Sequence, residues 1–421
     1  MSTTSPLIGI TAEWNPFHAG HSAMIDIIKK AYPQAPLIGI TAEWNPFHAG
    51  HSAMIDIIKK AYPQAPLIAI MSGAFVQRGE PALFDKWTRA GWAVRSGVDA
   101  VFEFPALYAL QSADRFSCHA ASMLHAMGVN MIAFGAESLT KDELLSAAGW
   151  AISEDYEHLL HERIAGGLSY GEAAHEAMAA AFPYLADELT KPNNLLGFRY
   201  TETILRKHYD MDILVIPRDM EHPVSATSAR RELLSQKTTA LLSPPDAKQA
   251  AKLMEEGHYT DPARYEDCCH LLSRLMPLEA LQAIGLFKEG LEYKWAKESQ
   301  RISYEEMLAA TKSKRYLRSS LKRLGAELLL SPAALSSPFL APPDPSYARL
   351  LALKREKSAL LRDLPLPIIT STAKAMKTLP KEAAAMLEMD IRASDVQSFC
   401  QKGSSYRKGK MDFYTSPVIV D

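Results

Sequence analysis

Two histidines separated by Ala49 and Gly50 are the residues of this chain best suited to catalysis. His48 and His51 follow the turn sequence 45–47, so that the motif reads N-P-F-H-x-G-H. Imidazoles can donate hydrogen bonds to phosphoryl oxygens, and Gly50 lets the backbone approach a phosphate closely. The pattern therefore favours stabilisation of charge that develops at an α-phosphate during nucleotidyl transfer. A zinc site is less favoured because no third ligand stands at a matching spacing, and chance occurrence of a short string is the structural alternative.

The motif occurs twice, because residues 7–36 and 37–66 are the same thirty residues. If residues 37–62 form the strand and helix that carry the motif, about four residues connect them to the next apolar segment, which is a usual length. Residues 7–32 in that role would lengthen the connection to about 34 residues, which costs about 1.9 kcal/mol of loop closure and favours the second copy about 25-fold. We therefore predict that His48 and His51 are the working pair. Residues 1–36 are then surplus and are expected at the surface, at an exposed sheet edge or against another molecule.

A second candidate phosphate site lies at residues 224–230, which read VSATSAR. Three hydroxyl residues precede Arg230 where a helix is expected to start, and Ser225, Thr227 or Ser228 can cap that helix. The free amides at the helix start and the guanidinium of Arg230 can then face a phosphate. Arg230 thus joins the two histidines as the third candidate catalytic residue.

Strand-like and helix-like segments alternate around these motifs. Apolar runs predict strands at 37–42, 67–71, 99–105, 130–135 and 212–218, and amphipathic segments predict helices at 51–62, 85–96 and 112–127. Apolar strands separated by helices predict an α/β fold with a doubly wound, mostly parallel sheet, in which ligands bind at the carboxyl ends of the strands. Beyond about residue 245 the pattern is mainly helical, with one further short strand at 366–370. The predicted domains are 37–245 and 246–421.

The composition is that of a globular protein, with 48% hydrophobic and 22% charged residues. No uninterrupted apolar run of about 18 residues is present, so we expect no membrane span. The first residues, MSTTSP, lack the basic and apolar regions of a signal peptide, and a cytoplasmic location is expected. The cysteines show no paired metal-ligand spacing and are expected to be reduced, packed thiols: Cys118, Cys268, Cys269 and Cys400.

A formal net charge of −2 does not indicate nucleic-acid binding, but two local segments are strongly basic. Residues 311–323 contain six basic residues and no acid, and leucines at positions 317, 321, 324 and 328 predict an apolar stripe on a helix with a cationic outer surface. Residues 404–414 interleave Lys and Arg with aromatic residues, which suits phosphate contact and base stacking. The alternative is an ordinary solvated face. The candidate nucleic-acid contacts are Lys314, Arg315, Arg318, Lys322, Arg407 and Lys408.

Together, the histidine motif and the VSATSAR segment resemble the nucleotidyltransferase superfamily, in which an I-S-S-T-x-I-R segment holds the triphosphate opposite the histidines. Further stretches are similar to the tRNA(Met) cytidine acetate ligase family, namely MSGAFVQRGEPALFDKW, SGVDAVFEFP, FGAE at 134–137 and KPNNLLGFRY at 191–200. The resemblance runs in named motifs from Leu37 to Leu233 and more diffusely beyond. It implies a nucleotidyltransferase-like fold and an enzyme that activates acetate with ATP as acetyl-adenylate. The acetyl group then passes to N4 of the wobble cytidine of elongator tRNA(Met).

The resemblance also implies the ligand contacts. The ATP site would comprise Thr41, Ala42, Glu43, Trp44, Asn45, Pro46, Phe47, His48, Ala49, Gly50, His51, Ser52, Ala53, Met54, Gly135, Asn193, Arg218, Ser225 and Thr227. Many relatives in the wider superfamily have Thr or Ser where this chain has Glu43, which is a candidate metal or ribose contact, or alternatively a helix cap. Magnesium is expected to accompany the triphosphate, without a dedicated protein metal site. The segment 246–421 would bind tRNA.

Two other functions use the same features. A small-molecule adenylyltransferase would share both motifs but would not need the basic C-terminal half. A tRNA-binding protein without catalysis would result if the duplicated segment blocked the site, and it would bind tRNA in a strongly salt-dependent way without turning over ATP.

Overall fold

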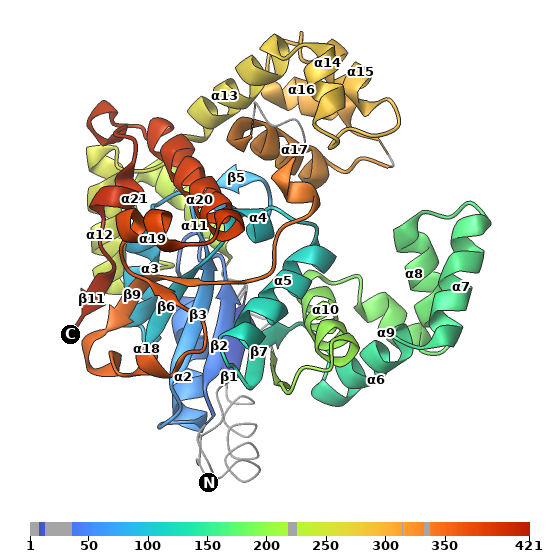
Figure 1. Ribbon diagram of the computed structural model, residues 1–421, viewed down its shortest axis with the longest axis horizontal. Coiled ribbons are helices and arrows are strands. Elements are labelled where there is room, and N and C mark those ends of the chain that lie inside the picture. The colour runs from blue at the N-terminus through green and yellow to red at the C-terminus, as the bar shows by residue number, and fades with distance from the viewer. Residues whose placement is uncertain (1–7, 13–35, 218–224, 314, 332–336) are drawn as a thin grey trace.

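A single nine-stranded sheet organises the chain, and helices cover both of its faces (Figure 1). The computed structural model describes residues 8–12, 36–217, 225–313, 315–331 and 337–421. The strands are β1 (Ile8–Ala12), β2 (Ile38–Ala42), β3 (Leu67–Ser72), β4 (Phe75–Val76), β5 (Glu80–Pro81), β6 (Ala100–Phe104), β7 (Met131–Ala136), β8 (Asp212–Pro217), β9 (Ala348–Lys354), β10 (Ile368–Ile369) and β11 (Val418–Val420). β4 and β5 form a separate antiparallel hairpin.

The helices fall into those that cover the sheet and those that project from it in two lobes, α6–α9 and α13–α17 (Figure 1). They are α2 (Ala49–Ala61), α3 (Lys86–Arg95), α4 (Ala106–Ala109), α5 (Ala113–Ala126), α6 (Lys141–Ala151), α7 (Glu154–Ala165), α8 (Tyr170–Ala179), α9 (Pro183–Glu188), α10 (Pro192–Arg206), α11 (Ala226–Gln236), α12 (Pro244–Glu256), α13 (Pro262–Leu275), α14 (Leu278–Ala283), α15 (Leu291–Glu298), α16 (Tyr304–Thr311), α17 (Arg318–Leu330), α18 (Leu360–Asp363), α19 (Thr372–Thr378), α20 (Lys381–Phe399) and α21 (Met411–Tyr414). Short 3₁₀ turns occur at Pro338–Leu340, Arg355–Lys357 and Ser404–Tyr406.

Both faces of the sheet are buried, as a doubly wound sheet requires. Side chains alternate along β3: Leu67, Ala69 and Met71 join one core with α2 and α3, whereas Ile68 and Ile70 join a second core with α4, α5 and α10. The predicted α/β class with a mostly parallel sheet is confirmed.

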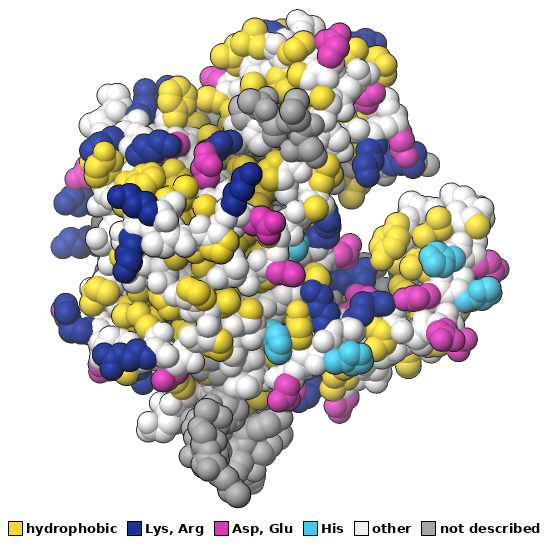
Figure 2. Space-filling model, in the orientation of Figure 1, with side chains coloured by type: hydrophobic (Ala, Val, Ile, Leu, Met, Phe, Trp, Pro, Cys, Tyr) yellow, Lys and Arg dark blue, Asp and Glu magenta, His cyan; other side chains and the backbone are white. Residues whose placement is uncertain are grey.

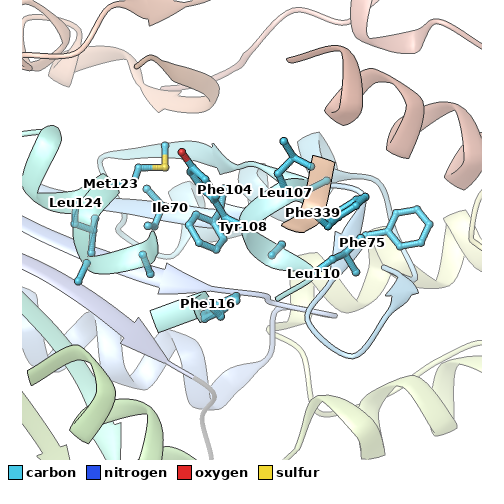
Figure 3. Close-up of a cluster of buried hydrophobic side chains, with 14 of the residues drawn as sticks. Ile70, Phe75, Phe104, Leu107, Tyr108, Leu110, Phe116, Met123, Leu124 and Phe339 are labelled. Carbon is cyan, nitrogen blue, oxygen red and sulfur yellow. The ribbon is translucent and has the colours of Figure 1, made fainter. Parts of the chain in front are cut away.

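Aromatic and aliphatic side chains pack together in the second core (Figure 3). Phe104 at the end of β6 packs against Tyr108 of α4 at 5.6 Å and edge-on against Phe116 of α5 at 5.1 Å between ring centroids. Phe339, from the 3₁₀ turn far along the chain, packs among them. This cluster fixes the carboxyl end of β6 beside the ends of the other parallel strands.

The two copies of the duplicated strand have the same partners in the sheet. β2 pairs in parallel with β3 and β7, and β1 pairs in parallel with β2, β3 and β7. Their registers are also equivalent, since Ile8 and Ile38 both lie opposite Met131. The prediction that the surplus strand lies at an exposed edge is therefore wrong, because an identical sequence satisfies the same central neighbours. β1 thus lies inside the sheet, paired with β2, β3 and β7.

The C-terminal part returns to the sheet. Helices α12–α17 confirm the predicted helical character after residue 244, but β9 pairs antiparallel with β6, and β10 and β11 flank β9. The predicted strand at 366–370 is confirmed by β10. The predicted segment 246–421 thus contains a helical part and three strands of the main sheet, because strand pairing over such a separation has no local signature.

A buried charge cluster fastens this C-terminal part to the sheet. The ammonium group of Lys86 lies 2.6 Å from Glu103 and 2.7 Å from Asp412. Arg349 of β9 lies 3.0 Å from Glu103 and also binds Asp412. All four side chains are at most 4% exposed. Removal of one partner would leave an uncompensated buried charge. Loss of any one of the four side chains is therefore expected to destabilise this contact between distant segments strongly.

Candidate functional site

The N-P-F-H-x-G-H motif joins the carboxyl end of β2 to the first turn of α2. β2 ends at Ala42, and α2 begins at Ala49 with His48 as its N-cap residue. The backbone N–H of His48 donates to Nδ1 of His51 over 3.0 Å, and the two rings stack with their centroids 3.7 Å apart. Both side chains are buried, with exposures of 1% and 3%. Because Nδ1 of His51 accepts this bond, the neutral ring carries its proton on Nε2, which is then a hydrogen-bond donor.

Aromatic packing shapes the turn between β2 and α2. Trp44 has a φ of 43°, in the left-handed region that residues other than glycine seldom adopt. Its ring meets the ring of Phe47 edge-on at 5.3 Å, and Phe47 lies 5.3 Å from the ring of His51. Trp44 and Phe47 are at most 2% exposed. The turn therefore presents the histidines from a packed base, and strained backbone of this kind is typical of functional sites.

The second motif meets this turn directly. Ser225 caps α11 by accepting from the N–H of Ser228 over 3.1 Å, as the sequence predicts. Arg230, one turn further on, donates from Nη1 to the carbonyl oxygen of Asn45 over 2.5 Å and from Nη2 to Oγ1 of Thr227 over 3.3 Å. The side chain of Arg230 remains 21% exposed. The structure thus brings Arg230 to the histidine turn from a position about 180 residues away in the chain.

The polar side chains of the turn bind the loop that follows β3. Oε1 of Glu43 accepts from the N–H of Gln77 over 2.7 Å, and Oδ1 of Asn45 accepts from the N–H of Leu83 over 2.8 Å. The helix-capping alternative for Glu43 is wrong, because His48 is the N-cap of α2. A metal or ribose contact through Glu43 stays a prediction.

Arg89 is a structural member of the site that the sequence analysis missed. Its fully buried guanidinium donates to the carbonyl oxygens of Phe84, Glu43, Ser72 and Gly73. Desolvation lowers the pKa of Arg89 to about 10, so the group stays charged at neutral pH. It ties the carboxyl ends of β2 and β3 together. One arginine in an amphipathic helix carries no sequence signal for this role.

The neighbouring strand β7 contributes the other predicted nucleotide contacts. Gly135 lies in β7 opposite Ile216 of β8. Just beyond, the carboxylate of Glu137 accepts from the side-chain amide of Asn193 over 2.5 Å and from the N–H of Asn194 over 2.8 Å. Asn193 is therefore fixed at the start of α10, close to the carboxyl end of β7. Its predicted contact with ATP would use polar atoms of Asn193 other than the side-chain amide hydrogen that Glu137 binds.

The remaining predicted ATP residues divide by burial. Ala42, Trp44, Phe47 and Met54 are core residues, so any contact they make with a ligand would come from the backbone. Thr41 is fully buried, and its hydroxyl has no hydrogen-bond partner among the described residues. Pro46 and Gly50 are buried, Ser52 and Ala53 are half-buried, and Ala49 is exposed. Arg218 lies outside the described residues.

The first basic segment is not one continuous helix. α17 begins at Arg318 with Leu317 as its N-cap, and Leu317 is 57% exposed, so the predicted apolar stripe begins at Leu321 instead. Arg315 lies before the helix and pairs with Glu289. The prediction of a helix from residue 311 is wrong because α16 ends at Thr311 and residues 312–317 connect the two helices. Lys314 lies outside the described residues.

Acidic partners accompany three of the five predicted tRNA contacts that the structure describes, and the first of these is Arg315. Arg318 pairs with Glu305, and Lys322 lies 3.1 Å from Glu80. In the second segment, Arg407 donates to the carbonyl oxygens of residues 401 and 402, and Lys408 lies over the ring of Tyr414 at 4.1 Å. Figure 2 shows Lys and Arg side chains spread over the C-terminal helices, whereas Asp, Glu and His side chains gather on the α6–α9 lobe. A polyanion would therefore meet its most favourable potential on the first of these surfaces.

Metal-binding clusters and membrane-spanning helices are absent from the described part of the chain. Within it, no group of three or more His, Cys, Asp or Glu side chains could hold a metal ion. No helix in the described ranges is long and apolar enough to cross a membrane. The four cysteines carry free thiols, as predicted.

Comparisons with known proteins agree on the family. The model of the family described as HIGH Nucleotidyl Transferase matches residues 35–412. The tRNA(Met) cytidine acetate ligase of Bacillus subtilis is 30% identical over 93% of this chain and 91% of its own length, and that of Syntrophomonas wolfei is 31% identical over 98% and 99%. The crystal structure of Thermotoga maritima TmcAL bound with alpha-thio ATP has the same fold, with a TM-score of 0.83 and 24% identity over 98% of this chain and all of that one. The chain belongs to the HIGH nucleotidyltransferase family and, within it, to the tRNA(Met) cytidine acetate ligases.

Proposed function

We propose that this enzyme activates acetate with ATP and transfers the acetyl group to N4 of the wobble cytidine of elongator tRNA(Met). The observation that carries the proposal is the meeting of His48, His51 and Arg230 around one turn at the carboxyl edge of the sheet. Donors fixed before the reaction stabilise developing charge without reorganising. The name of the Bacillus subtilis relative supports the substrates, and the ATP analogue bound by the Thermotoga maritima protein supports ATP as the activating nucleotide.

In the first step, a carboxylate oxygen of acetate attacks the α-phosphorus of ATP, and the bond to the bridging oxygen of pyrophosphate breaks. The Nε2–H of His51 would donate to the charged oxygens of the five-coordinate phosphorus, with His48 stacked against it. Arg230, whose remaining donors are partly exposed, would hold the leaving phosphates. The products are acetyl-adenylate and pyrophosphate.

In the second step, N4 of the cytidine attacks the acetyl carbonyl carbon, AMP leaves, and the amine loses one proton. The base must be unstacked from the anticodon loop to reach the mixed anhydride. Residues 37–245 would then hold ATP, and residues 246–421 would hold the tRNA through Arg315, Arg318, Lys322, Arg407 and Lys408. Magnesium would be bound chiefly by the phosphates of ATP, because the described residues offer no three-ligand cluster.

Pyrophosphate release tests the order of steps. With wild-type enzyme and ATP, release should require acetate and should proceed without tRNA until the adenylate fills the site. Release that ignores acetate would contradict the proposal. Release that requires a phosphorylated small molecule instead would identify a small-molecule adenylyltransferase.

A further inference from the structure

A cavity of about 300 Å³ lies beside Arg230 of α11, between the β4–β5 hairpin and helices α13, α16 and α17. Its walls include Glu80 and Leu83 from the β4–β5 region, Tyr265 and Glu266 from α13, and Lys322 from α17. The residues of the histidine turn do not line this cavity, whereas Arg230, the basic residue Lys322 and part of the MSGAFVQRGEPALFDKW stretch do. Its volume is at the lower end of the range of about 300–1,000 Å³ for ligand pockets, which suits one planar ring system.

The cavity shares a wall with the histidine turn. Arg230 donates to the carbonyl oxygen of Asn45 and lies 3.9 Å from Oε1 of Glu80. Asn45 also accepts from the N–H of Leu83, which lines the cavity. Only the shared wall at Arg230 and Asn45 therefore separates a group bound in the cavity from the position proposed for the α-phosphate.

Tight backbone contacts hold the walls in place. Gly79, in the β4–β5 turn, has a φ of +76°, and a Cβ atom added to it would lie 2.4 Å from the backbone nitrogen of Arg323 in α17. The hydroxyl of Tyr265 donates to the carbonyl oxygen of Gly79 over 2.9 Å. The hairpin, α13 and α17 are thus packed against one another without a ligand. A preformed cavity binds with little ordering cost.

The charges in the walls are balanced, because the acids Glu80 and Glu266 lie among the bases Arg230 and Lys322. Glu80 is already paired with Lys322 at 3.1 Å. Glu266 is half-buried, and no hydrogen bond or ion pair joins its carboxylate to another described residue. Burial raises the pKa of Glu266, the nearby cations Lys322 and Arg318 oppose this rise, and the acids Glu305 and Glu80 add to it. A neutral ring that bears an amine would enter this cavity without disturbing the balance of charge and would satisfy the acceptor of Glu266.

We infer that this cavity receives the acceptor nucleobase, with the carboxylate of Glu266 accepting a hydrogen bond from the exocyclic amine of cytosine. This inference rests on the proposed function, which requires an unstacked cytidine beside the adenylate. Acidic side chains recognise cytosine by accepting a hydrogen bond from its amine. Uracil has a carbonyl oxygen at that position, so two hydrogen-bond acceptors would face each other at Glu266. The apolar groups of Leu83 and Tyr265 offer surfaces for the faces of the ring.

The test compares two tRNA(Met) transcripts that differ only in C or U at the wobble position, with wild-type enzyme, Glu266→Ala, Glu266→Gln and the control Asp267→Asn. Asp267 is the next residue of α13 and is exposed. Binding without ATP should favour the C transcript by about tenfold or more in wild type and Asp267→Asn. Glu266→Ala should lose this preference, and Glu266→Gln, which retains a carbonyl acceptor, should keep part of it. Acetate-dependent ATP–pyrophosphate exchange should stay within about twofold of wild type in all variants, as expected for a residue that contacts only the base.

Two results would overturn the inference. An unchanged C preference in Glu266→Ala, or no preference in wild type, would exclude the cavity as the base pocket. Loss of exchange with a raised KM for ATP would assign the cavity to the nucleotide instead. Failure of the proposed function looks different, because wild-type enzyme would then show no acetate-dependent exchange whatever its preference in binding.

Discussion

The duplicated motif provides a matched pair of variants, His51→Ala and His21→Ala, within one chain. His51 lies in the described turn and accepts the bond from His48. Loss of one donor to developing charge lowers kcat by about 10²–10³-fold. His21 occupies the equivalent place in the other copy, so its removal changes the same chemical group and no described contact.

The equivalence of β1 and β2 sets the residual activity of these variants. Both strands have the same neighbours and registers, so the copies differ mainly in the loop that each leaves behind. From the difference of about 1.9 kcal/mol in loop closure, we expect about 4% of molecules to use the first copy at the active site. His51→Ala should therefore retain about 4% of wild-type activity, and His21→Ala about 96%. The double variant should fall to about 0.1–1%, because neither population then has the donor.

Acetate-dependent ATP–pyrophosphate exchange measures all three variants under one condition. A thermal unfolding curve for each variant serves as the control for folding. Similar losses in both single variants, or a loss confined to His21→Ala, would refute the assignment of His48 and His51 as the working pair. A double variant no weaker than His51→Ala would refute the exchange of copies while leaving that assignment intact.

Three other predictions concern binding, pH and stability. Arg230→Ala should lower exchange by about 100-fold and Arg230→Lys should recover only part of it, because one ammonium cannot replace the guanidinium, whereas the exposed neighbour Arg231→Ala should be near wild type in the same assay. Burial lowers the pKa of His119 to about 4, so the unfolded chain binds more protons than the folded one between pH 4 and about 6.5. The free energy of unfolding should therefore fall by up to about 3 kcal/mol as the pH drops through this window, and urea titrations of His119→Phe should lack this component. Asp412→Ala should destabilise the protein by about 3–5 kcal/mol in urea titrations, since it leaves two buried cations short of a partner; a change below 1 kcal/mol would contradict the structural role of the cluster.

Local patterns predicted much of the sheet and the start of the site. Apolar runs located β3, β6, β7 and β8, and the amphipathic segment after the histidines located α2. The position of Arg230 beside the histidine turn followed from motif order and from the rule that parallel strands end at one edge. These features depend on periodicity, capping residues and chain direction, which short stretches of sequence are sufficient to determine.

Features that depend on distant contacts were not predicted. The return of β9–β11 to the sheet depends on pairing with β6 across about 250 residues, and short apolar runs do not specify their partners. Arg89 lies in the predicted helix 85–96, and its burial depends on four carbonyl oxygens from separate segments of the chain. The basic residues of 311–323 suggested one open cationic face, but their acidic partners lie elsewhere in the chain. The cavity beside Arg230 likewise exists only after α13 and α17 pack on the β4–β5 hairpin.

The proposed acetylation can be tested by incubating the enzyme with labelled acetate, ATP and bulk tRNA and then digesting the tRNA to nucleosides. We expect label in N4-acetylcytidine, dependent on ATP and confined to one acceptor tRNA. Label in no nucleoside, or label that appears equally with His51→Ala/His21→Ala enzyme, would contradict it.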